Sequence, residues 1–159
     1  MAPCIPFGDF CQMFDAYSLK DSIQRLISDL NHDDAGMRFR SAWALGRIGN
    51  GAAAAIPALL NALNDEHTSV REAALTALGQ IHEQPVQCVP AITALLVDKD
   101  WRVRARAAEV LGDWGECAGS ALPELEKVAG DSDPSVRAAV AGALQRLNAF
   151  KCHELAASQ

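Results

Sequence analysis

The sequence predicts an all-α fold: a right-handed α–α superhelix, or solenoid, of four helix-pair repeats with an N-terminal cap helix. Two observations carry this prediction. Several residue types recur at a constant step of 33 residues, which indicates tandem structural units. Within each unit the apolar residues fall at i, i+3, i+4 and i+7, the spacing of one helix face. The composition agrees, because half of the 159 residues are apolar and only 6% are aromatic, as in helices rich in Ala and Leu.

The repeat is clearest where an apolar residue precedes an arginine. This pair occurs four times, at Met37-Arg38, Val70-Arg71, Val103-Arg104 and Val136-Arg137, each 33 residues after the last. The same step relates three other sets: Leu45, Leu78, Leu111 and Leu144; Gly46, Gly79 and Gly112; Pro57, Pro90 and Pro123. We therefore expect residues 19–148 to form four repeats, bounded near 19–51, 52–84, 85–117 and 118–148, and residues 149–159 to form a C-terminal cap or tail.

Each repeat is expected to contain two antiparallel helices joined by a polar turn. In repeat two the apolar faces of the two helices are formed by Ile56, Leu59, Leu60 and Leu63 and by Val70, Ala74, Leu78 and Ile81. The repeated prolines fall in the first turn of the first helices, where a missing N–H costs little. Ser18 followed by Asp21 predicts the N-cap of the first of these helices.

Residues 1–18 precede the repeats. Phe10, Met13, Phe14 and Tyr17 have the spacing of one helix face, so the segment is expected to form an amphipathic helix. We expect it to cap the open face of repeat one, which a solenoid requires. The alternative is a helix that docks on a partner or on a second copy of the chain.

Gly46, Gly79 and Gly112 lie inside the second helices, where glycine costs about 1 kcal/mol relative to alanine. Their recurrence predicts close contact between neighbouring helices with no room for a Cβ. The fourth repeat has Gln145 at this position, as expected of a terminal repeat that has no following neighbour.

A ladder of ion pairs is predicted along the turns. Its members are Asp65, Arg71, Asp98, Arg104, Asp131 and Arg137, each aspartate standing six residues before an arginine. In repeat one His32 precedes Arg38 at the same spacing. We interpret the ladder as structural rather than as a row of ligand-binding arginines, because its members do not vary between copies.

Charge, hydropathy and cysteine content restrict the function. The net charge of −6 argues against binding nucleic acid mainly through its phosphates. The chain has no run of about 18 apolar residues and its N-terminus does not resemble a signal peptide, so we expect a cytoplasmic protein without a membrane span. Five cysteines, an odd number without a C-x-x-C pair, predict free thiols.

Catalytic and metal-binding patterns are weak. The only His-Glu pairs are His82-Glu83 and His153-Glu154, and no Gly-rich phosphate loop or activated nucleophile is present. The sequence therefore predicts no catalytic residue, no cofactor and no metal, and it does not identify an enzyme.

The segments DEHTSVREAALTALGQI and DKDWRVRARAAEVLGDWG resemble HEAT repeats of the short phycobilisome-lyase type, and the resemblance covers roughly residues 19–148. It implies a HEAT/armadillo-like solenoid. The family includes scaffolds, lyase subunits, an iron hydroxylase and a DNA glycosylase, so the resemblance implies a fold rather than one function. The hydroxylases carry His-Glu at the start of second helices, where this chain has Arg71-Glu72 and Arg104-Ala105.

The second helices of such solenoids line a concave face, where partners bind. Positions of these helices that lie off the predicted core stripe are candidates for contact with a partner: Phe39, Arg40, Trp43, Arg47, Glu72, Thr76, Trp101, Arg102, Arg106, Glu109 and Arg146. Phe39 and Trp43 are one helical turn apart, and Trp and Arg are enriched at interface hot spots. Three covers for this aromatic pair remain open: a partner protein, a second copy of the chain, and the N-terminal segment.

The sequence thus predicts a non-catalytic protein-interaction or scaffold module, either a monomer or a homodimer. The alternative is a subunit or chaperone that handles a bilin or another tetrapyrrole, since arginines beside aromatic rings can pair with propionates. A nucleic-acid-binding or DNA glycosylase-like protein ranks below both because of the negative net charge.

Overall fold

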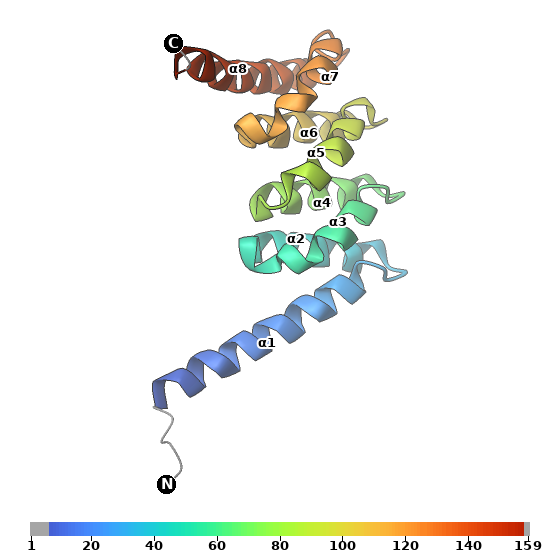
Figure 1. Cartoon of the computed structure of the whole chain (residues 1–159). Helices are drawn as coiled ribbons and strands as arrows, with labels where there is room; N and C mark the ends of the chain where they lie inside the picture. The colour runs from blue at the N-terminus through green and yellow to red at the C-terminus, as the bar shows by residue number, and fades with distance from the viewer. Residues whose placement is uncertain (1–6, 158–159) are drawn as a thin grey trace.

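The computed structural model describes the backbone of residues 7–157 and the side chains of residues 18–149. This part of the chain consists of helices joined by short turns and contains no strand. Figure 1 shows the helix pairs stacked along one axis, from α1 at the N-terminal end to α8 at the C-terminal end. The predicted all-α solenoid is confirmed. Within the described residues, no helix has the length and apolar character needed to cross a membrane.

The helices alternate between two layers. The first helices are α1 (Phe7–Asp29), α3 (Ile56–Ala62), α5 (Pro85–Ala94) and α7 (Leu122–Lys127). The second helices are α2 (Ala35–Ile48), α4 (Thr68–Ile81), α6 (Trp101–Asp113) and α8 (Pro134–Ala157). Three 3-10 segments adjoin the first helices: η1 (Gly49–Ala55), η2 (Leu95–Val97) and η3 (Gly115–Ala121). The second helices pack side by side in sequence order, α2 on α4, α4 on α6 and α6 on α8.

The N-terminal helix differs from the prediction. α1 runs without a break from Phe7 to Asp29, because no Gly or Pro interrupts the chain after Gly8. Ser18 is therefore not an N-cap: it lies inside α1, where the Ser22 hydroxyl donates to the Ser18 carbonyl at 2.7 Å. The predicted cap residues lie outside the described side chains: Phe10, Met13, Phe14 and Tyr17.

The start of α5 also differs from the prediction. Pro57 and Pro123 lie in the first turns of α3 and α7, as expected. α5 begins earlier in its repeat, at Pro85, so Pro90 lies inside the helix rather than in its first turn. Pro85 takes the initiating position instead, since its fixed φ suits the first residue of a helix.

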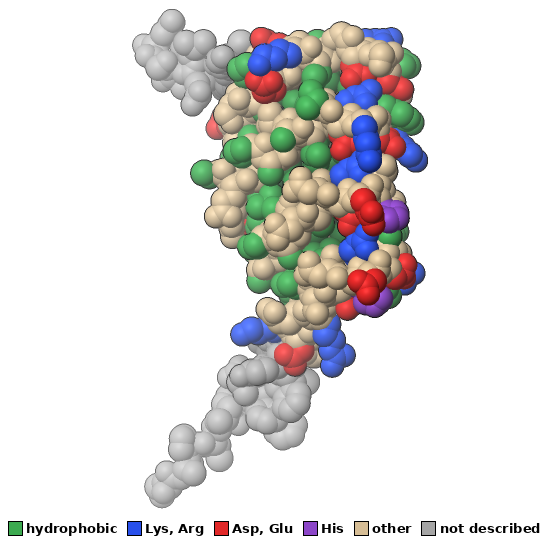
Figure 2. All heavy atoms as spheres, turned by 90° about the vertical axis from the view of Figure 1, so that its right-hand side faces the viewer, with side chains coloured by type: hydrophobic (Ala, Val, Ile, Leu, Met, Phe, Trp, Pro, Cys, Tyr) green, Lys and Arg blue, Asp and Glu red, His purple; other side chains and the backbone are tan. Residues whose placement is uncertain are grey.

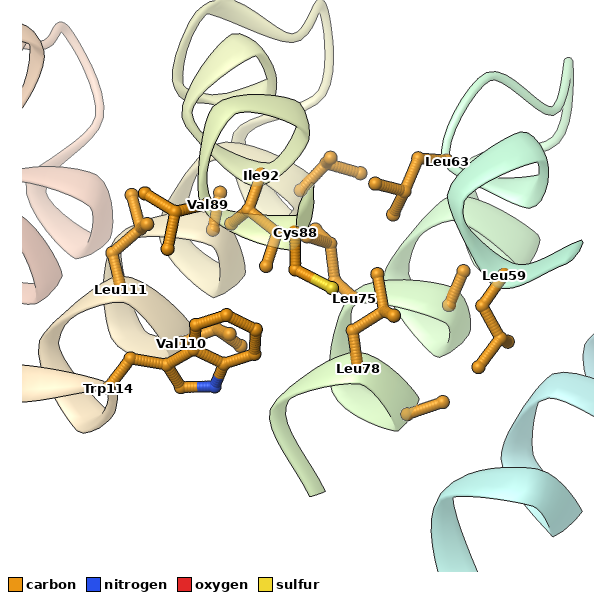
Figure 3. Close-up of a cluster of buried hydrophobic side chains, with 14 of the residues drawn as sticks. Leu59, Leu63, Leu75, Leu78, Cys88, Val89, Ile92, Val110, Leu111 and Trp114 are labelled. Carbon is orange, nitrogen blue, oxygen red and sulfur yellow. The ribbon is translucent and has the colours of Figure 1, made fainter. Parts of the chain in front are cut away.

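The apolar faces of both layers meet in one continuous core. Val70, Leu78 and Ile81 are at most 1% exposed, as the repeat pattern predicts. Trp114 stands in repeat three where Ile81 stands in repeat two, and it is also buried. Figure 3 shows its ring beside Val110, directed toward the side chains that join the second and third repeats.

Neighbouring second helices approach closely at the repeated glycines. A Cβ on Gly46 would lie 2.9 Å from Ala77 Cα, and one on Gly112 would lie 2.8 Å from Ala143 Cα. The nearest atoms to a Cβ on Gly79 would all belong to the Val110 side chain, the closest a methyl group at 3.1 Å. The predicted lack of room for a Cβ is therefore confirmed against the backbone at Gly46 and Gly112, and it is less strict at Gly79.

An arginine on each of α2, α4 and α6 holds the aspartate in the turn of the next repeat, a contact we call a rung. The three rungs are Arg38 with Asp65, Arg71 with Asp98 and Arg104 with Asp131. In each, Nε and Nη2 donate to the two carboxylate oxygens at 2.6 to 3.0 Å, the bidentate geometry of strong pairs. Figure 2 shows basic and acidic side chains gathered in a stripe along this edge of the molecule.

Each rung arginine is also tied to its own turn. Nη1 of Arg71 donates to the carbonyls of Asp65 and Glu66 at 2.8 and 3.1 Å, and the other rung arginines make the same kind of contact. The aspartate accepts from the backbone two residues on, as Asp98 does from the Asp100 N–H at 2.8 Å. One guanidinium therefore fastens two consecutive turns to each other.

The ladder stops at both ends of the described chain. Arg137 donates to the carbonyls of Asp131 and Ser132 at 2.7 and 3.0 Å, but it is exposed and pairs with no described carboxylate. At the N-terminal end His32 stands where the other repeats have aspartate. Its Nδ1 accepts from the Asp34 N–H at 3.0 Å, so the imidazole closes the turn without offering a carboxylate.

The rungs lower the pKa of two aspartates. The pKa of Asp131 is lowered mainly by the hydrogen bond from Arg104, and by the backbone hydrogen bond in its own turn. Burial would by itself raise the pKa of Asp65, but the hydrogen bonds from Arg38 and from the backbone outweigh burial, so this pKa is also lowered.

Gly46→Ala should destabilise the solenoid, because the added methyl group has no room against the backbone of α4. Overpacking of this kind costs about 1–3 kcal/mol. Gly142→Ala is the matched control: only Arg146 Nη1, at 3.7 Å, lies near its Cβ, so this change should gain about 0.5–1 kcal/mol of helix stability. Urea unfolding followed by circular dichroism measures both. Equal gains in the two variants would contradict the close-packing explanation.

Arg71→Met should lower the free energy of unfolding by about 3 kcal/mol, because Asp98 is left buried without its partner. The two side chains of this rung are only 4% and 8% exposed. Arg137→Met removes an exposed arginine that has no carboxylate, and should cost less than about 1 kcal/mol. Denaturant titrations measure the free energy of unfolding of both variants. Equal losses would mean that the buried rung stabilises the fold no more than an exposed arginine does.

Stability should fall as the pH drops below about 4. The ordinary pKa of both Asp65 and Asp131 is 3.8, and folding lowers it. The unfolded carboxyls therefore bind protons at higher pH than the folded ones, so the stability they contribute is complete above 3.8 and is lost as the pH falls through the folded values. Melting temperatures between about pH 5 and pH 2 measure this loss. Asp131→Asn should show a shallower fall, and an unchanged slope would assign the acid sensitivity to other carboxyls.

Candidate functional site

Large aromatic side chains are exposed on two of the second helices. On α2, Trp43 is 54% exposed and Phe39 is 39% exposed; at the start of α6, Trp101 is 44% exposed. Exposed apolar groups that cluster on one surface mark interaction sites more often than single ones do. We call Phe39, Trp43 and Arg47 the α2 group. We call the predicted binding residues around Trp101 the α6 group: Glu72, Trp101, Arg102, Arg106 and Glu109. Helix α4 lies between α2 and α6 in the layer.

The α2 group combines an aromatic face with a cation. Arg47 Cζ lies 5.3 Å from the centroid of the Trp43 ring, within the range of a cation–π contact. Arg40 turns instead toward Asp34, with Nη2 to Oδ2 at 3.8 Å, and toward Met37, with Nη2 to Sδ at 2.9 Å. Arg47 therefore stacks on the aromatic ring, whereas the side chain of Arg40 has its partners at the N-terminal end of α2.

The α6 group lines a pocket of about 280 Å³. Its walls are formed by five predicted binding residues, Glu72, Trp101, Arg102, Arg106 and Glu109, together with Ala105 and Ser135. Nη1 of Arg106 donates to Glu109 Oε2 at 2.8 Å, while its buried Nε has no partner among the described residues. The pocket thus presents a ring, cations and carboxylates side by side.

Asp100 fixes the start of α6 and orients Arg102. Its Oδ1 accepts from the Arg102 backbone N–H at 3.0 Å, as an N-cap does. The Arg102 side chain donates to the same carboxylate from Nε and Nη2 at 3.1 and 3.0 Å. This hydrogen bond is the main reason that the pKa of Asp100 falls to about 2. Arg102 is therefore held as an ion pair beside Trp101 at neutral pH.

The remaining predicted binding residues contribute less exposed surface or are already paired. Thr76 is half-buried, and its hydroxyl donates to the Glu72 carbonyl within α4 at 2.9 Å. Arg146 Nη2 lies 3.6 Å from Asp113 Oδ1. The structure therefore brings together the α6 group but keeps the α2 group and Arg146 apart from it.

The core stripe of the second helices is wider than the sequence pattern predicts. Ala73 and Ala105 fall off the predicted stripe, yet they are only 5% and 8% exposed. The reason is that α4 and α6 each pack on two neighbouring second helices as well as on their own first helix, and small residues permit that approach.

Sequence reasoning did not identify the contact between His82 and Trp114. Their ring centroids are 5.3 Å apart, and His82 has a left-handed backbone conformation with φ 51°. The repeat contains the signal for this conformation, because the 33-residue step relates His82 to Gly49 and Gly115, which also have positive φ.

A second pocket, of about 530 Å³, lies at the turns between the two helices of repeats one and two. Its lining includes Asn31, His32, Asp33, Asn61 and Glu66.

Among the described residues, no three His, Cys, Asp or Glu side chains are close enough together to hold a metal ion. The first turn of each second helix contains an arginine at the repeated position. Arg71 and Arg104, at the positions compared above with the His-Glu of hydroxylases, are rung residues.

Comparisons with known proteins agree with the fold. The model of HEAT repeats matches residues 11–79 and 89–156, and the model of the PBS lyase HEAT-like repeat matches residues 70–98. No curated protein sequence matches the chain.

Solved structures with this architecture include enzymes and a designed binder. The complex of CpcE and CpcF of phycocyanin lyase from Nostoc sp. PCC7120 matches with a TM-score of 0.66 and 26% identity, over 81% of this chain and 54% of that chain. Human deoxyhypusine hydroxylase in complex with glycerol matches with a TM-score of 0.65 and 27% identity, over 79% and 43%. A designed armadillo repeat protein in complex with the peptide (KR)4 shares the fold, with a TM-score of 0.66 and 20% identity over 77% and 62%.

The present chain thus spans about half the length of the lyase chain it matches. The family model of HEAT repeats covers most of the residues, and the three glycines and the three rungs recur at the 33-residue step. The chain belongs to the HEAT repeat family.

Proposed function

We propose that the chain is a non-catalytic protein-binding module that holds its partner on the concave face formed by α2, α4, α6 and α8. The observation that carries the proposal is Trp43, which is 54% exposed on α2 with Arg47 stacked on its ring. Trp and Arg are the residue types most enriched among interface hot spots. Solenoids of this kind bind partners along the surface that their stacked repeats create.

The α6 group provides a second contact on the same layer. Neighbouring helices pack about 8–10 Å apart, so the two helix steps from α2 to α6 separate the groups by roughly 20 Å. A partner segment that spans both groups would bury Trp43 at one end and Trp101 at the other. The pocket at Trp101, about 280 Å³, lies just below the usual size of small-molecule sites, which favours a protein side chain as its occupant.

Trp43→Ala should remove at least about 2 kcal/mol of partner-binding energy, as truncation of a hot spot does, and should leave the melting temperature nearly unchanged. The partner is captured from extract of the native host on immobilised wild-type chain, and binding of the variants is then measured by titration. Val86→Ala is the control, because Val86 is 87% exposed on α5, outside the second-helix layer.

A large drop in melting temperature of Trp43→Ala in a strictly monomeric sample would assign Trp43 a packing role instead. Equal loss of binding in the Val86 control would likewise contradict binding on the second-helix face.

A tetrapyrrole-handling lyase subunit or chaperone is the second candidate. Two findings favour it: the 26% identity to the CpcE–CpcF phycocyanin lyase complex and the match of residues 70–98 to the PBS lyase HEAT-like repeat. Arg102 and Arg106 beside Trp101 have the chemistry to pair with propionates and stack on a ring. Incubation with a bilin tests it: a red-shifted absorbance band that Trp101→Ala abolishes would support this candidate, and an unshifted spectrum would reject it.

A further inference from the structure

Among the side chains that the structure describes, none fills the flank of α2 that faces away from α4 as a preceding second helix would. In the later repeats this flank meets the preceding second helix: Ala77 lies against Gly46, and Ala143 lies against Gly112. The equivalent residue of α2 is Ala44, 33 residues before Ala77. Ala77 and Ala143 are at most 1% exposed, whereas Ala44 is only half-buried. In Figure 1, α1 diverges from α2 toward its N-terminal end.

The chemistry of this flank is aromatic and basic. The residues that take the place of Arg47 in repeats two and four are Gln80 and Arg146, which lie against the glycine of the preceding helix. Among the described helices no second helix precedes α2, and Arg47 stacks on Trp43 instead. No described carboxylate pairs with Arg47, and the carboxylate that pairs with Arg40, Asp34 Oδ2 at 3.8 Å, is exposed. α2 itself contains three arginines and no carboxylate.

The second helices hold most of the arginines, although the three rung arginines are neutralised by their aspartates and Arg102 by Asp100. Residues 35–48, 68–81, 101–113 and 134–149 contain nine of the ten arginines and only three carboxylates, Glu72, Glu109 and Asp113. The net charge of the chain is nevertheless −6, so its acidic residues lie mostly in the turns and first helices. Interfaces match positive with negative surfaces, which steers the encounter and excludes wrong partners. An acidic occupant therefore fits the flank of α2.

A second copy of the chain does not fit. If two copies stacked end to end, Arg137 of one copy would face His32 of the other. His32 offers no carboxylate, so no rung would form between the copies. Gln145 stands where Gly46 and Gly112 allow close approach, so its side chain keeps another second helix away. Two α2 flanks placed together would oppose arginine with arginine, which is repulsive.

We propose that the flank of α2 binds an acidic amphipathic helix of a partner protein, seated where a preceding second helix would pack. Its carboxylates meet Arg40 and Arg47, an apolar residue covers Trp43, and a small residue faces Ala44 so that the axes approach to about 8–10 Å. The proposal rests on the protein-binding function proposed above and adds the class and position of the partner element. A nucleic acid fits less well, because phosphate binding draws on many free cations and three carboxylates lie in the same layer.

The test uses a display library of helical peptides of about five turns, selected against the full-length chain. We expect the selected sequences to be enriched in Asp and Glu on one face. The variant with Arg40→Glu and Arg47→Glu should lose at least about tenfold in affinity for them, and should prefer peptides in which Lys replaces the acidic residues. Arg25→Glu is the matched control, because Arg25 is exposed on α1, outside the second-helix layer, and should bind as wild type does.

Several outcomes would overturn the proposal: no enriched peptide, enriched peptides without acidic residues, no effect of the double charge reversal, or tighter binding of a single-stranded oligonucleotide of similar length. A Trp43-dependent dimer in light scattering would identify a second copy as the occupant. Tighter peptide binding by Phe10→Ala with Phe14→Ala would identify the chain's own N-terminal segment.

The two proposals fail in different ways. If Trp43→Ala abolishes peptide binding and the charge reversal does not, the protein-binding function stands and the acidic partner is rejected. If neither change affects binding of the selected peptides or of the captured partner, the protein-binding role of α2 fails as well.

Discussion

The shared arginine fork is the contact that fixes one repeat against the next. Apolar burial holds the helices together but is non-directional, so by itself it permits sliding between layers of Ala and Leu. The fork removes that freedom, because one guanidinium bonds the carbonyls of its own turn and the carboxylate of the following turn. The side chains of the three rungs are 4–15% exposed. A misplaced repeat would thus leave a desolvated charge unpaired, which is among the larger local penalties a fold can carry.

The close approach at the glycines depends on this alignment. Gly46 and Gly112 leave room for the backbone of the next helix only when the two helices are in the register that the rungs impose. The close contact in turn buries Ala73 and Ala105. The register of the helices, their spacing and the burial of these alanines thus depend on polar atoms at the turns. The internal helices α4 and α6, packed between two neighbours, keep only a narrow strip of surface free for a partner.

Much of the fold could be predicted from the sequence because the residues that form each structural contact recur in several repeats. The apolar faces, the glycines and the Asp–Arg spacing recur, and recurrence separates structural positions from variable ones. Features that occur once are harder to predict. The continuity of α1 through Ser18 depends on the absence of a helix breaker, and the early start of α5 at Pro85 depends on an unusual connection in one repeat only.

Less of the candidate site than of the fold could be predicted from the sequence. Trp43 could be placed off the core because its counterparts, Thr76, Glu109 and Gly142, are not core residues. The partners of Arg40 could not, since a long side chain selects among neighbours outside the repeated pattern, here Asp34 and Met37. The wall of the pocket at Trp101 comes from three consecutive second helices, which only the packed structure brings together.

The rungs also bear on how a chain of this kind changes length over evolutionary time. The two residues of a rung are 27 positions apart, and each internal repeat carries both an acceptor for the arginine before it and a donor for the aspartate after it. Duplication or deletion of any 33-residue unit between Asp65 and Asp131 would therefore reconnect all of the rungs without a compensating mutation. Repeat one does not share this property, because His32 offers no carboxylate, and in repeat four Gln145 replaces the glycine that lets the next second helix approach. Tandem duplication of the internal units would thus lengthen the second-helix layer without breaking a rung.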